Sequence, residues 1–165
     1  MAVPENKNHL LEALPEADRR ALAPYLRRTE AKQHDLLFDV RDIIREVYFP
    51  LDAVVSLVIP LRTGEIVETA MVGRDGVVGG AGALHGRLSY HRAIVQVGGE
   101  FLRCPVGPLR EVVQDHPHLR SLLGAHEQAL LAQAQQSAAC NGTHAIESRL
   151  CRWLLRAADL HGSDE

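Results

Sequence analysis

The sequence predicts an α+β fold, in which an antiparallel β-roll similar to a jelly roll follows short N-terminal helices and precedes one long C-terminal helix. Three observations predict it. Apolar residues recur at three- and four-residue spacing near the start of the chain, and again from about residue 117 to 160. Between them, short runs rich in Val, Ile and Phe occupy residues 36–104. No helical segments separate these runs at βαβ spacing, so a parallel α/β sheet is excluded.

The N-terminal segment is expected to form a small helical cap, which Pro15 and Pro24 divide into short pieces. Strands are expected at residues 36–40, 47–50, 53–61, 66–72, 93–97 and 100–104. Residues 62–64 read as a three-residue hairpin loop, and Gly98 with Gly99 reads as a two-residue turn. Tight turns of this kind join neighbouring antiparallel strands, so the sheet is predicted to be mainly antiparallel.

Residues 117–160 read as long helix with an interruption near Asn141 and Gly142. A helix of about 25 residues is roughly 37 Å long at 1.5 Å per residue, which is more than a small β-domain needs to cover its own face. We therefore expect a symmetric homodimer along this helix, because its small residues allow close approach of two helices. A helix packed within one protomer is the alternative. The candidate seam residues are Leu123, Leu130, Ala134 and Ser137.

Length and composition narrow the class of protein. The 165 residues suffice for one domain, and 46% hydrophobic with 24% charged residues is typical of a globular chain. The net charge is −3 and the basic residues are scattered, so this segment is not expected to bind DNA by itself. Neither an apolar run of membrane-spanning length nor an N-terminal leader pattern is visible, which predicts a cytoplasmic protein without a membrane partner. Three widely spaced cysteines indicate neither a disulfide framework nor an iron–sulfur cluster.

Four segments follow one another in a specific order: the helical cap, a β-roll containing residues 47–50 and 53–57, the Gly-rich segment 72–79, and a long helix that ends in residues 149–155. Together they resemble the Crp/Fnr family of transcription regulators. No single motif is diagnostic, but their order along the chain is specific. The resemblance implies a cyclic-nucleotide-binding-like fold and the function of sensing an effector to regulate transcription.

The resemblance also implies a division of the chain. Residues 1–116 would form the sensor domain, 117–144 the dimerisation helix, and 145–165 the start of a C-terminal DNA-binding domain. In the family a winged helix-turn-helix follows, and its small core needs roughly 60 to 70 further residues. Any DNA binding is therefore expected only through that missing domain. Two explanations stay open: a truncated regulator, or a stand-alone interaction module without DNA-binding output.

The family resemblance directs attention to the Gly-rich turn as an effector pocket. Glycines let the backbone approach an anion closely, and an arginine can bind phosphate oxygens in a bidentate manner. The family's nucleotide-binding members carry a Glu for the ribose and an Arg for the phosphate, but the matching positions here hold Gly80 and His91. Arg92 follows one residue late, which in a strand points it to the opposite face. The sequence thus argues against cAMP or cGMP, and the effector is unknown. The pocket candidates are Gly73, Gly79, Gly80, Arg87, His91 and Arg92, closed by Gln135 and Gln136 from the long helix.

A metal site and an enzyme are the two other functions that the residue types allow. Cys140 and His144 stand at i and i+4, a spacing that can bind a metal or haem if further ligands are present, but nine histidines make such a coincidence common. We therefore expect no metal site. An enzyme is the main competitor from another class. The sequence contains no nucleophile elbow, no His-Glu-x-x-His pair and no phosphate loop, so no enzymatic activity is expected.

Overall fold

Two antiparallel sheets form the centre of the structure, a computed structural model that describes residues 8–84, 86 and 88–161. One sheet contains β1 (Arg27–Ala31), β7 (Gly99–Pro105) and β3 (Glu46–Pro50), in the order β1-β7-β3. The other contains β2 (Leu36–Phe38), β6 (Arg92–Val97), β4 (Val54–Pro60) and β5 (Ile66–Val72), in the order β2-β6-β4-β5. The predicted α+β class and the antiparallel sheets are confirmed.

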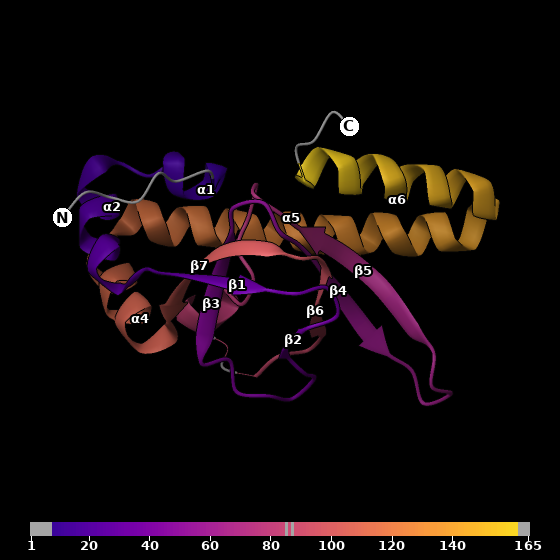
Figure 1. The fold of residues 1–165 in the computed structure, drawn as a ribbon, viewed down its shortest axis with the longest axis horizontal. Helices are drawn as coiled ribbons and strands as arrows, with labels where there is room; N and C mark the ends of the chain where they lie inside the picture. Colours follow the sequence, from indigo (N-terminus) through magenta and orange to yellow (C-terminus); the bar gives the residue numbers. More distant parts are fainter. Residues whose placement is uncertain (1–7, 85, 87, 162–165) are drawn as a thin grey trace.

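Helices precede, interrupt and follow the strands. The N-terminal cap consists of α1 (His9–Glu12), α2 (Glu16–Leu22) and the 3-10 turn η1 (Ala23–Tyr25), and its breaks lie at the prolines as predicted. The short α3 (Ala81–Leu84) lies between β5 and β6, and α4 (Val106–Asp115) follows β7. The long α5 (Pro117–Thr143) runs beside the strands along the length of the molecule, and α6 (Ile146–His161) ends the described chain (Figure 1).

The two predicted turns had different outcomes. The β4–β5 hairpin forms as expected: Leu61 N–H donates to the carbonyl of Glu65 at 2.7 Å, and Gly64 takes a left-handed φ of 92°. The turn predicted at Gly98 and Gly99 is wrong, because β6 and β7 belong to different sheets and do not pair. Gly99 instead marks a crossing, where a Cβ would lie 2.3 Å from Asp52 Oδ1.

The core has two main parts. Ten buried residues between the two sheets form one part, with Phe101 at 0% exposure, and Leu130 of α5 packs against it. The other part joins the N-terminal cap, β3, β7 and α4 to the first turns of α5, where Leu119 and Leu123 are fully buried. Burial of these leucines fixes α5 against the β-roll, at about 1.5 to 3 kcal/mol per side chain.

Buried polar contacts align the ends of the helices with the sheets. Asp18 of α2 accepts hydrogen bonds from the N–H of Leu119 at 3.0 Å and interacts with His116 Nδ1 at 2.8 Å, so it binds the start of α5. Arg110 of α4 donates a hydrogen bond of 2.6 Å to the carbonyl of Gly82 and thereby links α4 to α3. Burying a polar group costs little free energy when it is hydrogen-bonded, and these specific partners favour one arrangement of the helices.

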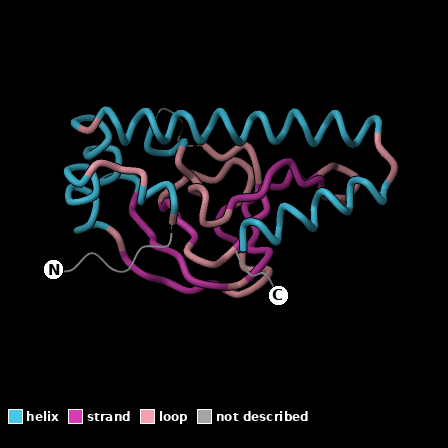
Figure 2. The backbone as a smooth tube through the Cα atoms, turned by 90° about the horizontal axis from the view of Figure 1, so that it is seen from above, coloured by secondary structure: helices cyan, strands magenta, loops and turns pink. Residues whose placement is uncertain are grey.

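The long helical segment is interrupted, close to the predicted place. Asn141 and Gly142 still belong to the last turn of α5, and the break falls at His144 and Ala145. From there α6 turns back toward the strands (Figure 2). Its Leu160 is 1% exposed and packs with Val54 and Met71 on the four-stranded sheet. No helix of the described part has both the length and the hydropathy needed to cross a bilayer.

Candidate functional site

The Gly-rich turn between β5 and α3 is held in place from both sides. The Asn8 amide donates to the carbonyls of Pro50 and Gly76, both at 2.9 Å, and is completely buried. Val78 pairs with Tyr48 of β3 through reciprocal backbone hydrogen bonds of 2.8 and 3.0 Å. Gly79 then takes a φ of 84°, which a residue with a side chain rarely adopts. The turn is therefore rigid and aims the start of α3 at α5.

Two side chains of α5 accept hydrogen bonds from this turn. His126 Nε2 accepts from the N–H of Val77 at 3.2 Å, and the Glu127 carboxylate accepts from the N–H of Ala81. A Cβ on Gly80 would lie 3.1 Å from Val77 Cγ1 and 3.2 Å from Glu127 Oε1, so the turn and α5 approach each other closely at this glycine. Two backbone donors that could bind an anion, the N–H groups of Val77 and Ala81, are thus paired with side chains of α5.

Burial shifts the titration of both α5 groups toward their neutral forms. Desolvation raises the pKa of Glu127, although the hydrogen bond from Ala81 opposes that rise. Desolvation lowers the pKa of His126, and nearby Asp75 opposes that fall. The neutral imidazole is the form that can accept from Val77, so the lowered pKa and the geometry agree.

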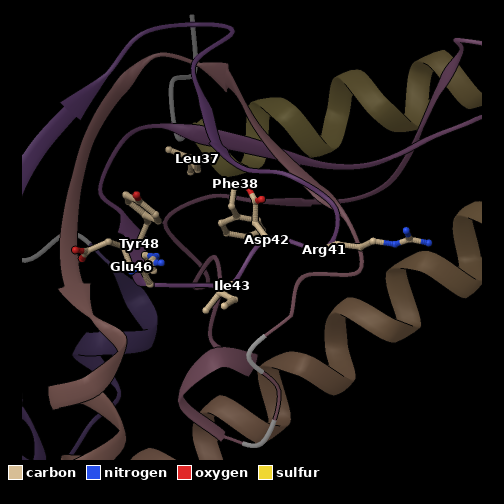
Figure 3. A pocket seen from close by; sticks show the side chains of 8 residues that line it. Leu37, Phe38, Arg41, Asp42, Ile43, Glu46 and Tyr48 are labelled. Carbon is tan, nitrogen blue, oxygen red and sulfur yellow. The ribbon is translucent and has the colours of Figure 1, made fainter.

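An open pocket of about 520 Å³ lies between β2 and β3. Phe38 and Tyr48 contribute rings to its wall and Asp42 and Glu46 contribute carboxylates, while Arg41 extends away from them (Figure 3). Sequence reasoning missed this pocket. The alternation of β3 places Glu46 and Tyr48 on one face, which is a usable signal, but the loop that completes the wall is not visible in the pattern.

A smaller pocket of about 230 Å³ lies between β5, α5 and α6. Glu68 and Met71 contribute from β5, Gln136 and Ser137 from α5, and Trp153 from α6. Ser56 of β4 donates a hydrogen bond of 2.5 Å to Glu68. This pocket therefore lies between the four-stranded sheet and α6, the last helix.

Comparisons with known proteins place this arrangement among solved structures. No family model and no curated protein matches the sequence. A c-di-GMP-responsive global regulator, CLP, from Xanthomonas campestris is similar with a TM-score of 0.70 at 14% identity, covering 85% of this chain and 70% of that one. A cyclic nucleotide-binding domain from Methylobacillus flagellatus has a TM-score of 0.62 at 16% identity, over 81% of this chain and 79% of that one. The sensor domain of the transcriptional regulator DNR from Pseudomonas aeruginosa has a TM-score of 0.60 at 16% identity, over 78% of this chain and 86% of that one.

This is a cyclic-nucleotide-binding fold. The similar structures include sensor domains and transcription regulators of the Crp/Fnr type. At sequence identities of 14–18%, the similarity shows the fold and not the ligand.

Neither His91 nor Arg92 is free to bind a phosphate in this cyclic-nucleotide-binding fold. Ala93 points into the core between the sheets, so its neighbour Arg92 points to the other face and makes a bidentate ion pair with Asp39, at 2.7 and 2.9 Å. His91 lies against the ring of Phe38 with centroids 5.7 Å apart, and burial lowers its pKa. Arg87 lies outside the described residues.

The remaining candidate residues do not gather into one pocket. Gly80 faces Glu127 of α5, whereas Gly79 faces Ile44 and Phe38. A Cβ on Gly73 would lie 2.7 Å from the Cβ of Leu160, so Gly73 permits close docking of α6. Gln136 lines the smaller pocket and donates to Cys140 Sγ at 3.2 Å, and Gln135 is exposed.

The proposed seam residues mostly face their own protomer. Leu123 is fully buried in the core and is not available to a partner helix, which corrects its assignment to the seam. Leu130 packs against the core between the sheets, Ala134 is half-buried, and Ser137 lines the smaller pocket. In the described residues, no three His, Cys, Asp or Glu side chains lie together as metal ligands would, and this includes the surroundings of Cys140 and His144.

Proposed function

We propose that this chain is the effector-sensing and dimerisation part of a Crp/Fnr-type transcription regulator. The fold and the regulators that share it support the regulatory class. In this proposal, residues 1–116 sense the effector, α5 pairs two protomers, and α6 begins the connection to a separate helix-turn-helix domain that binds DNA. The stand-alone interaction module is the second candidate, since it needs only the first two of these parts.

The observation that carries the proposal is the two-sided character of α5. One side packs on the Gly-rich turn through Leu123, His126 and Glu127. The other side is exposed over the described helix and presents mainly small residues at alternating spacings of four and three. These are Ser121, Ala125, Gln128, Ala132, Gln135 and Ala139, with Leu131 beside them at 58% exposure.

A spacing that averages 3.5 residues is the repeat of two paired helices, and small residues allow their backbones to approach closely. We therefore place the dimer seam on this exposed side, which we call the α5 outer stripe. A change at the Gly-rich turn would move His126 or Glu127, and these lie on the same helical turns as Ala125 and Gln128 of the stripe. Effector binding and pairing of protomers are thereby coupled through a single helix.

The effector in this proposal is a small molecule other than a cyclic nucleotide. A cyclic phosphate at this turn would compete with His126 and Glu127 for the N–H groups of Val77 and Ala81. The ion pair with Asp39 also removes Arg92 as a phosphate ligand.

Sedimentation velocity of the Ala132→Glu variant tests the proposal. Ala132 is exposed, and Glu is a good helix former, so the fold of the protomer is preserved. At the seam the two carboxylates would meet across the two-fold axis and lose solvent. We therefore expect the variant to be monomeric at tens of micromolar and the wild type to be dimeric. Ala158→Glu, an exposed alanine of α6, is the matched control and is expected to stay dimeric.

A monomeric wild type at these concentrations, or a dimer unaffected by Ala132→Glu, would contradict the placement of the seam. To separate the regulator from the stand-alone module, the chain is fused to a DNA-binding domain that binds its operator only as a dimer. Operator binding by the fusion that is lost with Ala132→Glu supports the regulator.

A further inference from the structure

The pocket between β5, α5 and α6 lies outside the β-roll. Met71 packs with Leu160 of α6, whereas its neighbours Ala70 and Val72 belong to the core between the sheets. The pocket is therefore on the outer side of the four-stranded sheet, and its Arg156 contacts the Gly-rich turn through an ion pair with Asp75. The side chains that matter for a ligand are Glu68, Met71, Gln133, Arg152, Trp153 and Arg156.

One end of this pocket carries a carboxyl group with free acceptor capacity. Glu68 accepts a hydrogen bond from the Ser56 hydroxyl at 2.5 Å and another from the Trp153 side chain. Ser56 is 3% exposed, so this end of the pocket is fixed. A carboxylate has about four acceptor sites, which leaves room for an incoming ammonium group. No basic side chain of the described residues forms an ion pair with Glu68.

The pocket also contains a guanidinium group without an ion-pair partner. Arg156 is paired with Asp75 at 2.6 Å, but Arg152 makes no ion pair with a carboxylate of the described residues. Burial raises the pKa of Glu68, and the hydrogen bonds from Ser56 and Trp153 and the charge of Arg152 oppose that rise. The pocket presents one carboxyl and one guanidinium group, with the Trp153 ring and Met71 as apolar walls.

We propose that this pocket binds a free α-amino acid with an apolar side chain. The ammonium group would donate to Glu68, the carboxylate would bind the fork of Arg152, and the side chain would lie on Trp153 and Met71. A volume of about 230 Å³ is below the range of roughly 300–1,000 Å³ typical of drug-sized ligands, which suits a single amino acid and excludes a nucleotide. A peptide terminus is disfavoured, because it offers only one of the two charges.

Binding here would hold α6 against the sheet, because Trp153 and Arg152 belong to α6 and Glu68 to β5. This proposal rests on the proposed function and extends it. The amino acid would be the effector, and the position of α6 would transmit its binding to the DNA-binding domain. A movement of α6 away from the sheet would break the contact between Trp153 and Glu68.

Trp153 is the chain's single tryptophan, so its fluorescence reports directly on the pocket. L-leucine is titrated first, because it does not absorb where tryptophan does. We expect a saturable change of emission with L-leucine. N-acetyl-L-leucine lacks the ammonium group and L-leucinamide lacks the carboxylate, and each is expected to bind at least about tenfold more weakly, equivalent to about 1.4 kcal/mol.

Two variants assign the charges. Glu68→Gln and Arg152→Gln should each weaken L-leucine binding about tenfold or more. Glu68→Gln should leave the affinity for N-acetyl-L-leucine unchanged, and Arg152→Gln should leave that for L-leucinamide unchanged, because the lost partner is already absent. Glu65→Gln and Arg62→Gln, exposed at the tip of the same hairpin, are the matched controls and should bind L-leucine as wild type does.

No saturable response to L-leucine up to about 10 mM would overturn the proposal, since that limit corresponds to less than about 3 kcal/mol of binding. Equal binding of the three ligands, or unaltered binding in both pocket variants, would also overturn it. Sedimentation of Ala132→Glu is independent of this pocket, so failure of the ligand proposal and failure of the dimer proposal are distinguishable.

Discussion

Two leucines of α5 give a sharp test of how this helix is oriented. Leu123 is fully buried beside the Gly-rich turn, whereas Leu131, about two turns later, is 58% exposed. Leu123→Ala removes most of a buried side chain and leaves a cavity, at a cost of about 3 to 5 kcal/mol in the free energy of unfolding. Leu131→Ala changes an exposed site and should alter it by about 0.5 kcal/mol or less.

Urea denaturation followed by circular dichroism measures both values. The measurements are made in the Ala132→Glu background, because dissociation of a dimer would otherwise add to the stability. A cost below about 1 kcal/mol for Leu123→Ala, or equal costs for the two leucines, would refute the orientation. In that case α5 would be rotated about its axis and the outer stripe would face the β-roll.

Three further predictions concern the thiols, the pH dependence and cyclic nucleotides. A thiol reagent should modify exposed Cys151 rapidly and spare Cys104, whose burial raises its pKa to about 12; rapid modification of both in native protein would contradict the fold. Lowering the pH below about 6.5 should destabilise the protein, because the unfolded chain protonates His126 while the folded chain, with its lowered pKa, resists. His126→Gln keeps an acceptor for Val77 and should reduce this pH dependence in urea denaturation, and an unchanged dependence would exclude His126 as its source. Calorimetry should give cAMP and cGMP dissociation constants no better than roughly millimolar, and micromolar binding abolished by Arg92→Ala would overturn the account of the Gly-rich turn.

Local patterns predicted the elements whose partners are near in the chain. The β4–β5 hairpin follows from Thr63 and Gly64, and the breaks in the N-terminal cap follow from two prolines. β1 was missed because Arg27–Ala31 contains almost no apolar residue, and its partner β7 lies about 70 residues later. The turn at Gly98 was predicted wrongly because the local sequence does not show that β6 and β7 join different sheets.

The site shows the same limit. Helical periodicity identified an apolar side of α5, but periodicity does not say whether Leu123 meets its own β-roll or a partner. Register reasoning placed Arg92 on the outer face of its strand, and the ion pair with Asp39 agrees with it. Glu127 was missed, because its contact with Ala81 depends on where α5 passes the Gly-rich turn.

The distance between two copies of the outer stripe tests the central claim most directly. Gln128→Cys is spin-labelled in a Cys151→Ser background, which leaves Cys104 and Cys140 buried. Paired helices lie about 8–10 Å apart, so pulsed electron paramagnetic resonance should give an intermolecular distance on the order of 20 Å or less, which is lost when Ala132→Glu is added. Absence of an intermolecular distance at tens of micromolar, or a short distance that survives Ala132→Glu, would contradict the pairing of protomers along the outer stripe of α5.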